Sequence, residues 1–372
     1  MRAALAVMLT VAIFGLTYGL SAPLIALRLS AVGYSEAAIG INAAMHALGV
    51  LLIAPALPML ARRLAAKTLM LTALLSLVVL FLLFPLLPLW SWFLLRLLVG
   101  MASEVILVVA ETWLNHQAVD AQRARTMAAY TAMLSLGFAL GPLLIGLLGS
   151  GGAAAFLSAA ALALLAAASL LSVRLSPLPA GRETRRSLVH WLRLIPLALG
   201  ATLLNAALES AGMNLLAIYA ISLGWSEAAA TQLIAVLLLG AIVLQLPIGW
   251  LADRLPRRPL MTGLALISTL GAVAWPLVLA HPVLAWSVLF LWGGVFVGIY
   301  TLIITLVGER FQGATLAGVY AMLSVAWGLG ALIGPALAGW AMTVTPHGLA
   351  WFAAVGCGAF TLQALFASPQ RT

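Results

Sequence analysis

Residues 137–146 read GFALGPLLIG, and residues 330–339 repeat the same spacing as GALIGPALAG, 193 residues later. Glycines four residues apart let two helices approach closely, and proline removes a backbone hydrogen bond so that a helix can bend. We therefore predict a helix-bending motif in each half of the chain, comprising Gly137, Gly141, Pro142, Gly334 and Pro335. We also expect these two segments to make a tight contact with each other.

The composition around this repeat is that of a protein surrounded by lipid. The chain has 372 residues, of which 65% are hydrophobic and 7% are charged. A soluble fold needs a more charged surface than this. The apolar runs are roughly 20 residues long and do not alternate with the strand period, so they predict membrane-spanning helices rather than a β-barrel.

Polar residues and Gly/Pro breaks divide the chain into twelve predicted spans. These are residues 4–29, 37–60, 67–88, 90–114, 126–149, 153–173, 194–221, 227–251, 258–280, 283–307, 313–341 and 347–367. The repeat groups them into two pseudo-symmetric six-helix bundles, at residues 1–173 and 194–372, joined by a linker at residues 174–193. The predicted fold is thus an all-α integral membrane protein.

The basic residues predict its orientation. Of the 18 Lys and Arg residues, all but Arg28 and Arg96 fall at the termini or in alternate connections between spans. The positive-inside rule then places both termini and the linker in the cytoplasm, as in a multi-pass protein of a bacterial inner membrane. The formal charge of +9 is explained by this distribution, so we expect no nucleic-acid partner.

A second repeat lies in two short loops. Residues 249–260 read GWLADRLPRRPL, and residues 58–69 read PMLARRLAAKTL, an offset of 191. Residues 249–260 resemble the loop signature G-x-L-x-D-R-x-x-R-R of the major facilitator superfamily. Arg96-x-x-x-Gly100 and residues 137–146 are similar to two further motifs of that superfamily. The first loop departs from the signature, because Pro58 replaces its Gly and Arg62 replaces its Asp.

The resemblance implies a fold, a mechanism and a class of partner. Members of the superfamily carry small molecules by alternating access, in proton-coupled or facilitated transport, and spans one, four, seven and ten line their cavity. Residues 111–115 (ETWLN) look like a small bacterial branch of the superfamily, and the motif in residues 137–146 is associated with exporters that exchange protons.

Charged residues inside a membrane span are costly, which makes them candidates for function. Arg96, Glu104 and Glu111 in span four lie within about 80° of one another around a helix, so they form one polar stripe. We predict that Glu104 is a protonation or substrate site, with a structural pairing to Arg96 as the alternative. Arg96 is a candidate for coupling or anion binding. Glu111 is expected to pair with loop arginines.

Two further spans carry pairs of polar residues one helical turn apart. Asn205 and Glu209 in span seven form a second candidate coupling or substrate site, although a protonated Glu209 could simply donate a hydrogen bond between helices. Asn42 and His46 in span two suit a proton relay, since histidine titrates near physiological pH. The alternative is a buried histidine that is satisfied by a neighbour.

The loop at residues 249–260 predicts a cytoplasmic gate. Its members are Asp253, Arg254, Arg257 and Arg258. We expect the carboxylate to meet a facing helix amino terminus or an arginine, and the gate to hold the outward-facing state closed on the cytoplasmic side.

Three functions remain open at this point. The first is proton-coupled export of a small amphipathic or hydrophobic compound. The second is proton-coupled uptake of a small organic solute, with Arg96 or Arg28 as the anchor if the solute is an anion. The third is a non-transporting sensor or scaffold. The sequence contains no G-x-S-x-G or phosphate-binding loop, so an enzyme is not expected. We expect no cofactor or metal; the partners are the substrate, protons and membrane lipid, and a monomer suffices.

Overall fold

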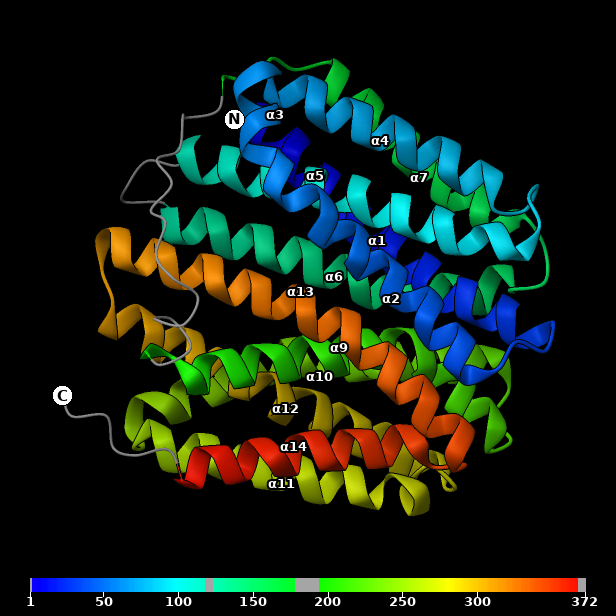
Figure 1. Cartoon of the computed structure of the whole chain (residues 1–372), viewed down its shortest axis with the longest axis vertical. Coiled ribbons are helices and arrows are strands. Elements are labelled where there is room, and N and C mark those ends of the chain that lie inside the picture. The colour runs from blue at the N-terminus through cyan, green and yellow to red at the C-terminus, as the bar shows by residue number, and fades with distance from the viewer. Residues whose placement is uncertain (1, 118–122, 178–193, 367–372) are drawn as a thin grey trace. The chain divides into compact units, whose positions relative to one another are not determined.

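The computed structural model describes residues 2–117, 123–177 and 194–366, which form α-helices joined by short turns (Figure 1). The first half contains α1 (Arg2–Ala31), α2 (Glu36–Ile53), α3 (Leu57–Arg63), α4 (Ala66–Leu83), α5 (Trp92–Gln117), α6 (Arg123–Leu148) and α7 (Ala154–Leu171). The second half contains α9 (Pro196–Ser222), α10 (Glu227–Arg254), α11 (Arg257–Val278), α12 (Pro282–Arg310), α13 (Gly313–Val344) and α14 (Gly348–Phe366).

Twelve segments among the described residues are long and apolar enough to cross a membrane, which confirms the predicted fold class. Many large apolar side chains on them are exposed, such as Leu147 and Leu246, as expected for helices whose solvent is lipid.

Prolines account for two differences from the predicted spans. The second span is interrupted by a 3₁₀ turn at Ala54–Ala56, between α2 and α3, where Pro55 and Pro58 lack backbone N–H donors. The third span ends at Leu83, because Pro85 and Pro88 follow in the connection to α5. Of the predicted linker, residues 178–193 lie outside the described part of the chain.

The chain divides into two compact units. Unit 1 comprises residues 1–34, 45–182 and 227–235, and unit 2 comprises residues 35–44, 183–226 and 236–372. Two helices contribute to both units, since the first turns of α2 belong to unit 2 and the first turns of α10 belong to unit 1.

Helices pair in the same way inside each unit. In unit 1, α1 packs most extensively on α6, and α4 packs on α7 and α5. In unit 2, α9 packs most extensively on α13, and α11 packs on α14 and α12. Figure 1 shows α1 running beside α6. The sequence repeat is therefore also a repeat of helix packing.

Glycines form a matching helix crossing in each unit. In unit 1, Gly49 of α2 packs against the backbone of Leu97 in α5, and Gly100 of α5 packs against the backbone of His46 in α2. A Cβ atom at either glycine would overlap with a carbonyl oxygen of the facing helix. Small residues are typical of such close helix contacts in membranes.

The crossing in unit 2 uses the equivalent positions. Gly240 of α10 packs against the backbone of Phe290, and Gly293 of α12 packs against the backbone of Leu237. These four residues follow their counterparts in unit 1 by 191 or 193 residues, which are the offsets of the two sequence repeats.

The glycines of the Gly-Pro segments pack within their own units, and the expected contact between the two segments, which belong to different units, stays a prediction. Gly137 and Gly141 of α6 pack against the backbone of α1, between Ala12 and Leu20. Gly330 and Gly334 of α13 pack against the backbone of α9, at Leu203 and Ala207. Each motif therefore joins two helices of its own unit, and Pro142 and Pro335 lie within continuous helices.

Candidate functional site

The first polar cluster of unit 1 surrounds Arg96 of α5. Its side chain is fully buried, and its guanidinium carbon lies 5.9 Å from the ring centroid of Tyr18 in α1. The ring of Tyr18 lies 4.8 Å from the imidazole of His46 in α2, centroid to centroid. The Gly49–Gly100 crossing positions these groups, because it brings the backbone at His46 against Gly100, one turn after Arg96.

His46 in this cluster is 7% exposed, and its Nδ1 atom has no hydrogen-bond partner among the residues that the structure describes. The same holds for the Nδ2 atom of Asn42, one turn earlier on α2. A buried polar atom without a partner is costly, so such atoms are expected where a water, an ion or a ligand completes the site.

The second polar cluster of unit 1 contains Glu104 and Glu111 of α5 together with Tyr130 of α6. Glu104 and Glu111 lie seven residues apart on one face of α5, and the Tyr130 phenol lies in the neighbourhood of both. Glu104 is partly exposed, Glu111 is exposed and Tyr130 is buried. Neither carboxylate forms an ion pair within the described chain, so the expected pairing of Glu111 with arginine is not found there.

The predicted polar stripe on α5 therefore separates into two sites. Glu104 forms no ion pair with Arg96 or with any other described residue. Eight residues separate the two, which corresponds to about 12 Å along the helix. Arg96 therefore faces α1 and α2, whereas Glu104 lies with Glu111 and Tyr130.

In unit 2, the predicted pair on α9 forms a smaller site. The Nδ2 atom of Asn205 lies 3.4 Å from Oε2 of Glu209, a long hydrogen bond within one helix. The Oδ1 atom of Asn205 has no partner in the described chain, and Glu209 forms no ion pair there. The structure thus brings these two residues together but adds no charged neighbour to them.

The repeat shows which of these polar residues the fold does not require. Leu289 follows Arg96 by 193 residues and is fully buried on α12, next to Phe290 and one turn before Gly293. Leu237 follows His46 by 191 residues and faces Gly293. The same glycine crossing therefore forms in unit 2 with two leucines in place of the arginine and the histidine.

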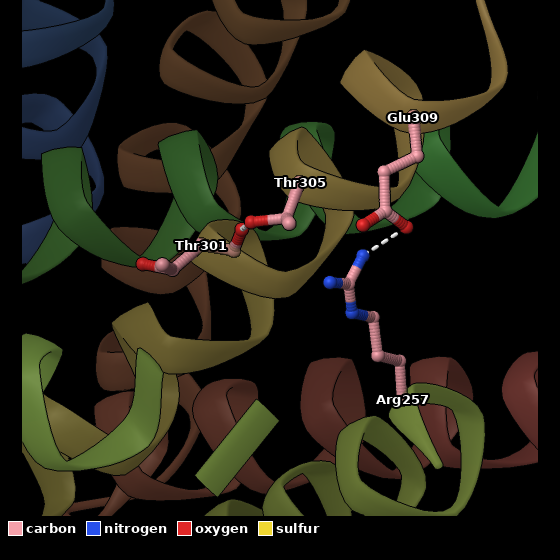
Figure 2. A network of polar contacts seen from close by, with 4 residues as sticks. All are labelled: Arg257, Thr301, Thr305 and Glu309. Atoms are coloured by element: carbon pink, nitrogen blue, oxygen red, sulfur yellow. Dashed lines mark hydrogen bonds and ion pairs between the residues drawn. The ribbon is translucent and has the colours of Figure 1, made fainter. Parts of the chain in front are cut away.

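At the predicted gate, the ion pair does not involve Asp253. Arg257, at the start of α11, pairs with Glu309, in the last turn of α12 (Figure 2). Arg254 stacks over Trp250, with its guanidinium carbon 3.9 Å from the ring centroid. Asp253 is exposed and forms no ion pair with the residues described. Arg258 lies partly buried in the next turn.

Arg28, the alternative anion anchor, has a structural role in unit 1. Its guanidinium donates hydrogen bonds to the backbone carbonyls of Ser150 and Gly151, in the turn between α6 and α7. Glu227 accepts hydrogen bonds from the same turn, at 2.9 Å from the Ser150 amide and 2.7 Å from its hydroxyl. Arg28 and Glu227 thus both hold this turn.

Sequence reasoning missed Tyr130 and Glu309. Tyr130 lies on α6 and is an uncharged residue among small and apolar neighbours, so only its position beside α5 draws attention to it. Glu309 could have been found, because it is a lone carboxylate at the end of a span whose neighbouring loop is basic. The described residues contain no group of three His, Cys, Asp or Glu that could hold a metal ion.

The chain resembles known proteins over most of its length. The model of the Major Facilitator Superfamily matches residues 7–204 and 197–372. An uncharacterized MFS-type transporter of Bacillus subtilis, YfkF, is 26% identical over 350 residues, which cover 90% of this chain and 87% of the relative. An uncharacterized MFS-type transporter of Yersinia enterocolitica is 25% identical over 284 residues, covering 76% of this chain and 73% of the relative.

Solved structures share the fold at low identity. A D-xylose-proton symporter superimposes with a TM-score of 0.81 at 16% identity, covering 99% of this chain and 98% of the symporter. The nucleoside transporter NupG gives a TM-score of 0.78 at 15% identity, with complete coverage of both chains.

Proposed function

Because the chain belongs to the major facilitator superfamily, we propose that it is a proton-coupled transporter that exports a small amphipathic or hydrophobic compound in exchange for protons. It works by alternating access as a monomer in a bacterial inner membrane, with both termini in the cytoplasm. The two six-helix bundles at residues 1–173 and 194–372 are the moving parts, and residues 174–193 link them.

The observation that carries this proposal is the chemical difference between two equivalent helix crossings. Arg96 and His46 occupy positions where the second half of the chain has Leu289 and Leu237. A buried guanidinium is expensive inside a membrane, and the second crossing forms without one. The polar residues are therefore retained for transport rather than for folding.

Two carboxylates are the proposed proton carriers. Glu104 and Glu209 lie within spans, and neither forms an ion pair with a described residue. A carboxyl group without a fixed counter-charge gains or loses a proton when its solvent access changes, which is what coupling requires. Asn205 orients Glu209, and His46 relays protons together with Asn42, one turn earlier on the same helix.

The proposed gate is the basic loop at residues 249–260 together with Glu309. Arg257 and Glu309 form its ion pair, Arg254 is held on Trp250, and the exposed Asp253 engages in another transport state, with Arg258 as a further member of the gate. Gly137, Gly141 and Pro142, with Gly334 and Pro335, let α6 and α13 bend while each stays against its partner helix.

Uptake of a small organic solute is the second candidate function, and one cluster favours it. Arg96, His46 and Tyr18 together offer hydrogen-bond donors that suit an anion or a sugar-like hydroxyl group. A D-xylose-proton symporter is among the structures of the same fold.

The test is transport in an efflux-deficient bacterial host that expresses the chain. We expect lower accumulation of at least one compound in a labelled panel, and loss of this effect with an uncoupler and in Glu104→Gln or Glu209→Gln. Higher accumulation of a compound, also abolished by the uncoupler, would replace export by uptake. Depletion that persists with the uncoupler would remove the proton coupling.

A further inference from the structure

We propose that unit 1 binds the headgroup of an anionic phospholipid at the turn between α3 and α4. The binding residues are three exposed arginines, namely Arg62 and Arg63 at the end of α3 and Arg174 after the end of α7. The turn joins the second and third spans, so it lies at the depth of the lipid headgroups. The partner is a lipid of the surrounding membrane, so this inference goes beyond the proposed transport function and holds for export and for uptake.

Lys67 brings the arginines of the two chain segments together. It lies in the first turn of α4, four residues after Arg63, and α4 packs beside α7 (Figure 1). Its Nζ atom donates hydrogen bonds to the carbonyl oxygens of Leu171, at 2.9 Å, and Val173, at 2.7 Å. Val173 directly precedes Arg174 in the chain. The end of α7 is therefore tied to the turn between α3 and α4, and the basic residues of both gather there.

No described acidic side chain neutralises the three arginines. None of the three forms an ion pair or a hydrogen bond with a residue that the structure describes. Arginine keeps its charge at physiological pH, and like charges held close together are stabilised by an anion between them. The planar guanidinium donates paired hydrogen bonds that match the oxygens of a phosphate group. The cluster therefore suits a ligand that carries a phosphate.

The corresponding loop of unit 2 satisfies its own charges. By the offset of 191 residues, Asp253 and Arg254 are the counterparts of Arg62 and Arg63. The guanidinium carbon of Arg254 lies 3.9 Å from the ring centroid of Trp250, and a further arginine of that loop forms the ion pair in Figure 2. The loop of unit 1 has neither the acidic residue nor the aromatic ring at the equivalent positions. Its arginines are thus left for a partner outside the chain.

Exposed apolar side chains beside the arginines identify this partner as a lipid. Met59 is 43% exposed, Leu64 is 42% exposed and Leu171 is 65% exposed. Leu64 directly follows Arg63, and Leu171 carries one of the carbonyl groups that Lys67 binds. A phosphate dissolved in water gains nothing from these side chains. A phospholipid places its acyl chains on them while its headgroup contacts the arginines.

Two lipids that share their acyl chains but differ in headgroup charge test this proposal. We would mix the purified full chain in detergent with equal amounts of dioleoylphosphatidylglycerol and dioleoylphosphatidylcholine, and measure the bound lipids by native mass spectrometry. We expect a preference of about tenfold or more for the anionic phosphatidylglycerol. Equal binding of both lipids, or binding of neither, would overturn the proposal. Displacement of the phosphatidylglycerol by an equal concentration of inorganic phosphate would also overturn it, because the ligand would then be a dissolved phosphate.

A matched pair of variants then locates the site. Arg63→Gln and Arg254→Gln each remove one positive charge, at equivalent positions of the two loops, so an effect of net charge alone is the same in both. Arg63→Gln should lower the preference for phosphatidylglycerol about fivefold, and Arg62→Gln/Arg63→Gln should abolish it. Arg254→Gln should leave it unchanged. A preference that persists in the double variant, or that falls equally in Arg63→Gln and Arg254→Gln, would overturn the proposal.

Melting temperatures in phosphatidylcholine alone show whether the variants remain folded. The three arginines are exposed, so these substitutions should leave the melting temperature unchanged. If the double variant melts early, Arg174→Gln takes its place, and it should lower the preference about fivefold; an unchanged preference there would overturn the proposal. The assay contains no transported compound, so a failure of this inference leaves the proposed transport function standing.

Discussion

The α2–α5 crossing of unit 1 and the α10–α12 crossing of unit 2 share their backbone contacts but differ in their chemistry. Each crossing is closed by two glycines, Gly49 with Gly100 and Gly240 with Gly293. In unit 1 the adjacent positions carry a buried arginine and a histidine, whereas the equivalent positions in unit 2 carry leucines.

The comparison separates the residues that the fold requires from the residues that we assign to function. The glycines are common to both crossings, so they belong to the architecture. The polar side chains occur in one crossing only, and they leave buried atoms such as His46 Nδ1 without a partner in the described chain. An unsatisfied polar group destabilises a fold, so its presence points to a role in binding or proton transfer.

The largest expected effect is on transport, from a substitution that makes unit 1 resemble unit 2. Arg96→Leu should reduce the transport rate about 100-fold or more, because it removes a charged donor worth about 3 kcal/mol in a buried hydrogen bond. Folding should be retained, since Leu289 occupies the equivalent position. Initial rates in proteoliposomes and thermal melting of the purified protein measure the two properties. The matched control is Leu289→Met, and loss of folded protein in Arg96→Leu alone would contradict the comparison.

A second test asks whether the glycine crossings are equivalent in stability. Gly100→Ala and Gly293→Ala each place a Cβ atom against a backbone carbonyl oxygen of the facing helix. Both should destabilise the protein by about 1–3 kcal/mol, by forcing the helices apart. Melting temperatures of the two variants should fall by similar amounts, with Gly249→Ala as a control at a glycine with open space around it. A large fall in only one of them would show that the crossings are not equivalent.

A smaller effect is expected at His46. The His46→Leu substitution introduces the residue found at the equivalent position 237, so the melting temperature should not fall. If the imidazole relays protons beside Arg96, proton-coupled transport should slow about tenfold. This is less than the roughly 100-fold or more of a lost general acid or base, because water partly replaces the relay. Transport of the same compound down its own gradient, without a pH gradient, distinguishes the relay from substrate binding. Equal slowing in both assays would contradict the relay.

The smallest effect is expected at the Arg257–Glu309 ion pair. The side chain of Glu309 is 55% exposed, and exposed pairs contribute about 0–1 kcal/mol. Glu309→Gln should therefore change the transport rate about two- to fivefold and leave binding of the compound unchanged. The charge-reversed double variant Arg257→Glu/Glu309→Arg should restore the rate. A double variant no better than the singles would remove this pair from the gate.

The architecture could be predicted from residue patterns, because each pattern depends only on the residues of one short segment. Apolar runs long enough to span lipid gave the twelve spans, and the spacing of Gly141 and Pro142 recurred at Gly334 and Pro335. Span ends were displaced where prolines changed the helix type, as at Pro55 and Pro58. These are properties of short segments, so one sequence is enough to reveal them.

The candidate site was only partly predictable, because it depends on which helices meet. Periodicity placed Arg96 and Glu104 on one stripe, but their separation into two clusters follows from the positions of Tyr18 and Tyr130 on other helices. The gate shows the same limit, since the partner of Arg257 is Glu309, on a different helix. The helical periodicity of one segment does not predict contacts between residues of different helices.

The interlocked backbones of α1 and α6 have a mechanical consequence. Gly15 and Gly19 of α1 meet Gly137 and Gly141 of α6 so closely that main-chain atoms, rather than side chains, form the contact. Changes of side-chain rotamer cannot loosen such a main-chain contact, so we expect the two helices to move as one rigid unit. A bend at Pro142 must then carry α1 with it, and Tyr18 moves with α1 relative to the other helices of its cluster. A bend at Pro142 would therefore change the position of Tyr18 in the polar cluster around Arg96.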